Sequence, residues 1–125
     1  MNDPTVTDPD KYVVVFENEA VRVLEYRDEP GAKTRLHAHP DSVMITLSGF
    51  ARRIAVGEQT RDVSLAPGEV RWLDAQSHWG ENIGTTPSHA FFVELKSGRD
   101  GSSAKGALGP SPHSSAPEWG RWEPA

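Results

Sequence analysis

Residues 31–39 read GAKTRLHAH and end in two histidines, His37 and His39, that are separated by one alanine. If this stretch forms a β-strand, alternate side chains point to the same face, so both imidazole rings converge on one point. Imidazole binds zinc, copper, iron and nickel, and a strand holds two such rings in fixed positions. The pair is therefore a candidate for two ligands of one metal ion, and a third ligand must come from elsewhere.

The best candidate for the third ligand is His78, which begins the run HWGEN of residues 78–82. It follows a Pro-Gly turn at residues 67–68 and a short apolar run at Val70–Leu73. An isolated His-x-His pair is better explained by ordinary half-buried histidines. With a third histidine in register, metal binding becomes the favoured interpretation.

Short runs of alternating apolar and polar residues fill the chain from Tyr12 to Lys96, and Gly, Pro, Asp and Asn separate them. This pattern is typical of successive half-buried strands, and no convincing helix is expected in the region. We predict nine strands, at Tyr12–Phe16, Val21–Tyr26, Thr34–His39, Val43–Leu47, Ala51–Val56, Arg61–Leu65, Val70–Leu73, His78–Ile83 and Ala90–Leu95. Short strands with tight turns favour an all-β barrel or sandwich with antiparallel connections.

The length of 125 residues fits one compact domain. We expect an N-terminal extension over residues 1–10, a barrel over residues 11–96 and a Gly/Ser/Pro-rich C-terminal tail over residues 97–125, which is too polar to fold alone. This tail either stays extended or wraps across a neighbour. Trp119 and Trp122 could dock its end, and a frayed end is equally compatible with the sequence.

The composition argues against several classes of protein. No apolar stretch approaches the roughly 20 residues of a membrane helix, and residues 1–10 are acidic and polar, so we expect a cytoplasmic protein without membrane contact. The absence of cysteine excludes disulfides and thiolate ligands. A formal net charge of −5 with scattered basic residues argues against nucleic acid. The expected partner is a small molecule.

The histidine pattern resembles that of the cupin superfamily. The first cupin motif has a glycine, five residues and His-x-His, followed by a glutamate and a glycine, and Gly31, His37 and His39 match its first part. The second motif has Pro-Gly-Asp, a short apolar strand and His-x-x-x-Asn. Residues 67–69, His78 and Asn82 resemble it, although the match to the motif is one residue short. The resemblance implies a single jelly-roll β-barrel with one divalent transition metal ion, such as Fe, Zn, Ni or Mn, on the three histidines.

The chain departs from the cupin pattern at the glutamate of the first motif. Counting forward from His39 places this glutamate at Val43 or Met44, and counting back from Gly49 places it at Ser42. The expected site then has three histidines with open positions, or borrows a carboxylate. Asp41 is nearest along the chain, but we expect it to point out of its turn. Glu94 interrupts an apolar run, so it could be a ligand, an acceptor behind a ligand, or part of an ion pair across a dimer interface.

Other candidate residues are expected to lie outside the metal site. His89 borders a turn, and His113 lies in the polar tail, so both are expected in solvent. Trp72 and Trp79 could line a pocket, although core or dimer contacts are the more common role of such residues. An inward arginine could hold a substrate carboxylate, whereas most of the four arginines on neighbouring strands are expected on an outer face: Arg52, Arg53, Arg61 and Arg71.

The stretches VRVLEYRDEPG (21–31), HAHPD (37–41) and FVELK (92–96) resemble small stand-alone bacterial cupins, some of which carry the label of β-alanine degradation proteins. Three-histidine sites without the glutamate occur among iron-dependent dioxygenases of the superfamily. This resemblance implies a metal-dependent enzyme, a dioxygenase or lyase that acts on a small carboxylate or dicarbonyl compound. The alternative is a non-catalytic cupin that shelters a small ligand. We also expect a homodimer, with Tyr12–Phe16 as a strand that the two copies exchange.

Overall fold

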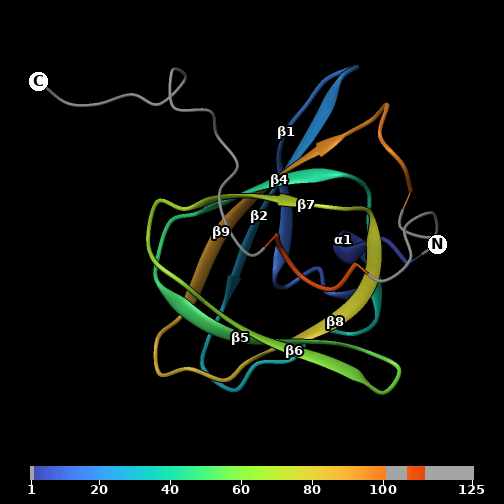
Figure 1. Cartoon of the computed structure of the whole chain (residues 1–125). Helices are drawn as coiled ribbons and strands as arrows, with labels where there is room; N and C mark the ends of the chain where they lie inside the picture. Colours follow the sequence, from blue (N-terminus) through green and yellow to red (C-terminus); the bar gives the residue numbers. More distant parts are fainter. Residues whose placement is uncertain (1, 101–106, 112–125) are drawn as a thin grey trace, which may run out of the picture.

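The computed structural model describes residues 2–100 and 107–111. These residues form two antiparallel sheets and a short helix (Figure 1). The helix and strands are α1 (Pro4–Thr7), β1 (Tyr12–Glu17), β2 (Val21–Asp28), β3 (His37–His39), β4 (Ser42–Thr46), β5 (Phe50–Val56), β6 (Gln59–Leu65), β7 (Val70–Leu73), β8 (Gln76–Asn82) and β9 (Ser88–Leu95).

The nine predicted strands are confirmed, with ends that differ by a few residues. The largest difference concerns the stretch predicted at Thr34–His39, of which only His37–His39 forms the strand β3. Ahead of it, the Arg35 amide donates to the Asp8 carboxylate (3.0 Å) instead of to a neighbouring strand. Helix α1 lies in the N-terminal extension, where Asp3 caps its first turn.

One sheet has the strand order β1-β2-β9-β4-β7 and the other has the order β3-β8-β5-β6. The two sheets enclose one apolar core, made of Tyr12, Leu24, Tyr26, Met44, Phe50, Leu65, Leu73, Ala90 and Phe92. The predicted all-β barrel is confirmed. No helix among the described residues is long and apolar enough to cross a membrane.

Strand β8 brings polar side chains into this barrel. Its buried positions alternate and fall on Gln76, His78, Gly80 and Asn82, so these four residues share the inward face. Strand β3 pairs with the beginning of β8, and β5 pairs with its end. Strand β8 therefore lines the interior with polar groups, next to the apolar core that both sheets supply.

Part of the C-terminal tail lies against the barrel of its own chain. Residues 107–111, the short red segment in Figure 1, cross between β7 and β8, and we call them the strap. Arg61 donates to the carbonyl oxygens of Leu108 and Pro110, both at 2.8 Å, and Arg71 donates to that of Ser111. Arg61 and Arg71, two of the four arginines of which most were expected on an outer face, thus hold the strap. The expectations for His113, Trp119 and Trp122 concern residues outside the described ranges.

Truncation of a core side chain should lower the free energy of unfolding more than the same truncation at the surface. Leu24 is 0% exposed and Leu47 is 42% exposed. Leu24→Ala should lower the free energy of unfolding by about 2–5 kcal/mol, because it leaves a cavity. Leu47→Ala should change it by less than about 0.5 kcal/mol. Urea denaturation of both variants measures the difference, and equal losses would contradict the described core.

Candidate metal centre

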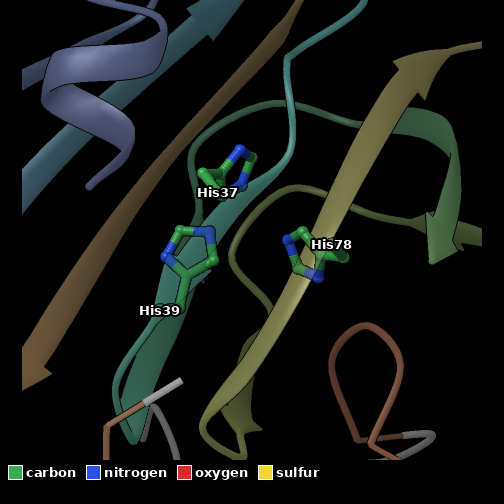
Figure 2. Close-up of side chains that lie close together, drawn as sticks. All are labelled: His37, His39 and His78. Atoms are coloured by element: carbon green, nitrogen blue, oxygen red, sulfur yellow. The ribbon is translucent and has the colours of Figure 1, made fainter. Parts of the chain in front are cut away.

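The three histidines of the sequence prediction meet inside the barrel. His37 and His78 are direct partners in the β3–β8 pair, and His39 lies two residues further along β3 on the same face. One nitrogen of each ring lies within 4.8 Å of the others, and all three residues are buried. Figure 2 shows the rings facing a common space, two from β3 and one from β8. This cluster could hold a metal ion.

Hydrogen bonds fix the tautomers of two of these rings. His37 Nδ1 lies 2.8 Å from the Arg35 carbonyl oxygen, and His78 Nδ1 lies 2.7 Å from Gln76 Oε1. Both partners are acceptors, so each Nδ1 carries the proton and each Nε2 keeps its lone pair. Both rings therefore offer Nε2 as the metal-binding atom.

His39 has no hydrogen-bond partner for either ring nitrogen, although it is fully buried. A buried polar atom without a partner is costly. The nearest acceptor is Glu94 Oε2, 3.7 Å from His39 Nδ1, and this oxygen is unpartnered too. A metal ion on Nε2 would satisfy one nitrogen, and a small approach of Nδ1–H to Glu94 would satisfy the other, as is usual for metal-bound histidines. The residues present therefore fit a metal ion.

Glu94 lies beside the ring of His39 without a hydrogen bond to it, a position that suits an acceptor behind a ligand, one of the three roles left open by the sequence. Its Oε1 accepts a hydrogen bond from Arg22 Nε at 2.8 Å, which orients the carboxylate. It lies on β9 directly opposite Ser42, one of the positions where the motif glutamate was sought. Strand β4 has no carboxylate at the motif position, and the neighbouring strand β9 carries one instead. This Glu94 carboxylate faces Nδ1 of His39 and lies outside the histidine cluster.

Burial keeps the rings of His37 and His78 free of a second proton at neutral pH. Desolvation, with a smaller contribution from neighbouring His39, lowers the pKa of His37 to about 3. The same two causes, together with His37, lower the pKa of His78 well below its usual value. Neutral imidazole is the form that binds a metal ion, so protons compete little for these two rings.

Gln76 links the strap to His78. Its Oε1 accepts from the Gly109 amide at 2.6 Å as well as from His78, and its Nε2 donates to the Gly109 carbonyl oxygen at 3.2 Å. Nε2 also donates to the Asp74 carbonyl oxygen at 2.8 Å. If the side-chain amide were flipped, its NH₂ group would face the Gly109 amide donor, and its oxygen would face the carbonyl oxygens of Asp74 and Gly109. The strap and Asp74 together therefore fix the orientation of Gln76, and Gln76 fixes the tautomer of His78.

The other carboxylate and histidine candidates lie outside the cluster. Asp41 is held by Arg99 and by the Ala75 amide, and its hydrogen bonds with Arg99 lower its pKa to about 2. His89 Nε2 lies 2.7 Å from Glu25 Oε2, and the side chain is 27% exposed, so it is paired at the surface instead of lying free in solvent. Neither residue contributes a ligand atom.

A cavity of about 30 Å³ lies against His37 and His78. Apolar side chains form most of its wall, and Trp72 and Trp79 are not among the lining residues. Tyr12 and Arg52 do line it. The Tyr12 hydroxyl lies 3.5 Å from His37 Nε2. The cavity holds about two water molecules at about 10–15 Å³ each, which limits any ligand to a few heavy atoms.

The inward position of Arg52 could have been found from strand parity. Phe50 and Ile54 lie two residues to either side of it, and all three are buried on the same face of β5. Gln76 and Tyr12 were missed because nothing in a single glutamine, or in a tyrosine at the start of an apolar strand, signals a contact with a distant histidine.

No protein-family model and no curated protein matches the sequence significantly. Solved structures do match the fold. A cupin domain from Bordetella pertussis Tohama I is 25% identical, with a TM-score of 0.64, and the match covers 69% of this chain and 92% of that chain. A double-stranded β-helix domain protein from Klebsiella pneumoniae is 22% identical (TM-score 0.54, 78% and 84% covered), and a cupin superfamily protein from Desulfitobacterium hafniense DCB-2 is 17% identical (TM-score 0.51, 67% and 74% covered).

The chain has the jelly-roll barrel that the motifs predicted, and its likeness to these cupin structures supports a small protein of the cupin superfamily. It carries three buried histidines that could hold a metal ion, with no carboxylate in the described cluster.

The carboxylate behind His39 should tune metal affinity. His39→Gln should remove stoichiometric zinc binding, because it removes a ligand. Glu94→Gln should weaken zinc binding about 10- to 100-fold, because the ring loses its acceptor while the shape of residue 94 is kept. Competition with a zinc-binding dye and elemental analysis measure both. His89→Gln is the matched control, and a loss of zinc in that variant as large as in His39→Gln would contradict this site.

Proposed function

We propose that the chain is a metal-dependent enzyme, an oxygenase or lyase that acts on a small carboxylate or dicarbonyl compound. In this proposal Nε2 of His37, His39 and His78 holds one divalent transition ion, Fe, Zn, Ni or Mn. The observation that carries it is the set of three buried imidazoles, without a carboxylate among the ligand atoms, beside a small cavity. An ion held by three protein ligands keeps open positions and can act as a Lewis acid toward a bound ligand.

Tyr12 would act on the ligand as a hydrogen-bond donor. Burial raises the pKa of its phenol well above the ordinary value, so the hydroxyl keeps its proton at neutral pH. Its only described hydrogen-bond contact is His37 Nε2, the atom that a metal ion would occupy. In the metal-loaded protein the hydroxyl is then free to donate to an oxygen of the ligand in the cavity.

One observation favours the alternative, a cupin that binds a small ligand without converting it. Among the described residues, no free carboxylate or neutral histidine outside the cluster lines the cavity. Asp28 and Glu94 are each paired with an arginine, and Tyr12 is protonated. A general base is therefore absent from the described wall, and a proton transfer would have to use the ligand itself or water.

Metal reconstitution followed by activity measurement tests the two functions. The protein loaded with Fe, Zn, Ni or Mn is offered small carboxylates and diketones, and oxygen uptake and products are recorded. The enzyme proposal expects turnover with at least one ion, dependent on oxygen for an oxygenase and independent of it for a lyase. His39→Gln should abolish turnover. Ligand binding without product for every ion would establish the alternative.

We also propose that the chain forms a homodimer through β1. This strand is at one edge of its sheet, and Val13, Val14, Val15 and Phe16 are each at least 40% exposed. An exposed apolar edge strand is a surface that pairs with another chain. In the described chain β1 pairs with its own β2, so exchange of this strand stays a prediction.

Light scattering should give twice the mass of one chain. The double variant Val13→Lys/Phe16→Lys should give the mass of one chain, because two charges cannot be buried in an apolar interface. Val70→Lys is the matched control, since Val70 is 50% exposed on β7 at the other edge of the same sheet. A monomeric wild-type protein would refute the dimer.

A further inference from the structure

The strap covers one side of the cavity that lies beside the histidines. Strands β1 to β9 each contribute at least one residue to the cavity wall, and Pro110 of the strap is the one described lining residue outside them. A Cβ added at Gly109 would lie 3.3 Å from Cγ1 of Ile54, which also lines the cavity. The strap backbone therefore packs directly against the cavity wall.

The strap also connects the outer strands of the two sheets. β6 ends one sheet and β7 ends the other, and among the described residues β6 pairs only with β5 and β7 only with β4. The Ser111 amide donates to the Trp72 carbonyl oxygen on β7 at 2.8 Å. Arg61 on β6 donates to the carbonyl oxygens of Leu108 and Pro110. The strap therefore covers a side of the barrel that no β-ladder closes in the described chain.

Hydrogen bonds hold the strap through its backbone. Those with Arg61, Arg71, Trp72 and Gln76 all use carbonyl oxygens or amides of the strap, and Pro110 is its one buried side chain. Each hydrogen bond contributes modestly, because the same groups bind water when the strap leaves. Release of the strap therefore breaks a few hydrogen bonds and leaves the ladders of both sheets intact.

We propose that the strap is a lid, and that its release opens the cavity between β6 and β7 to solutes that reach the histidine cluster. With the strap in place, the three histidines are at most 6% exposed. The cavity then has room for about two water molecules, so a larger solute needs an opening. This inference does not depend on the proposed reaction, because an ion, a substrate and a chemical reagent all need the same opening.

Chemical modification of the metal-free protein tests the lid. Diethyl pyrocarbonate attacks a neutral imidazole nitrogen and is too large for the closed cavity. Peptide mass spectrometry gives its rate of reaction with each histidine. His89 has a side chain that is 27% exposed, so it serves as the reference within the same protein. When opening and closing are fast, the rates at His37 and His78 are proportional to the fraction of molecules with a released strap.

Arg61→Met removes two hydrogen bonds to the strap and keeps the length of the side chain. It should raise the modification rates of His37 and His78 about 10- to 100-fold, the change expected for the loss of two bonds from a charged donor. Arg53→Met is the matched control, because Arg53 lies on the neighbouring strand β5 and pairs with Asp62 at the surface. It should leave both rates at the wild-type value.

Leu24→Ala separates release of the strap from unfolding of the whole barrel. It weakens the core on β2, so it should raise the modification rates less than Arg61→Met does. A larger increase in Leu24→Ala than in Arg61→Met would mean that the rings react through global unfolding, and it would overturn the lid.

A disulfide can hold the strap in place, since the chain has no cysteine of its own. A Cβ added at Gly109 would lie 3.8 Å from Cβ of Ile54, the usual separation across a disulfide. In Gly109→Cys/Ile54→Cys, the oxidised form should be modified at His37 and His78 at least about 10-fold more slowly than the reduced form. Both forms carry the strain of a side chain at the positive φ of 76°, so their difference isolates the disulfide.

Zinc exchange separates the lid from a purely structural role of the strap. In the zinc-loaded protein, Arg61→Met should speed zinc uptake and chelator-driven release by the same factor, because both directions pass the same opening. The dissociation constant should stay unchanged, because the strap is still closed most of the time. Weaker zinc binding with an unchanged rate of uptake would make the strap a structural part of the site and overturn the lid.

The metal-free rates keep this inference separate from the proposed function. If wild type binds no zinc, the proposed metal centre is wrong, and the modification rates still decide the role of the strap. Equal rates at His37 and His78 in wild type, in Arg61→Met and in both forms of the cysteine variant would overturn the lid and leave the proposed function standing.

Discussion

The site depends on the register of the β3–β8 pair. His37 lies opposite His78, and this single alignment places the third ring beside the first two. A slip of one residue would turn the inward face of a strand outward, so the ligand set exists in one register only. Next to this pair, the alternation of β8 places Gly80 and Asn82 in the barrel, which fixes the surroundings of Arg52 as well.

The polar groups inside the barrel are tolerated because most of them are paired. Asp28 accepts hydrogen bonds from Tyr26, Arg52, Asn82 and the Ser88 amide, and although burial opposes it, these contacts lower the pKa of its carboxyl. Such a network is stable only when its members are satisfied. The exceptions, His39 and Glu94 Oε2, lie at the candidate metal centre. The unsatisfied atoms therefore coincide with the place where a ligand is expected.

The sequence was sufficient for the strands, which follow from periodicity, and for the His37–His39 pair, which follows from spacing within one strand. His78 followed from its place in the second motif. It was not sufficient for the groups around them. Glu94 could be singled out as a carboxylate in an apolar run, but its place behind His39 depends on which strands are neighbours in the sheet. Gln76 depends on a contact with Gly109, 33 residues away. Pairing between distant segments is set by the whole fold and leaves no local signature.

The contact between Gln76 and the strap makes the tail a component of the candidate site. The amide of Gly109 and the ring of His78 contact the same oxygen atom, so both contacts require the same orientation of the Gln76 amide. Without the strap, Gln76 would keep its contact with the Asp74 carbonyl oxygen and lose both contacts with Gly109. The orientation of the amide, and with it the proton on Nδ1 of His78, would then depend on the Asp74 contact.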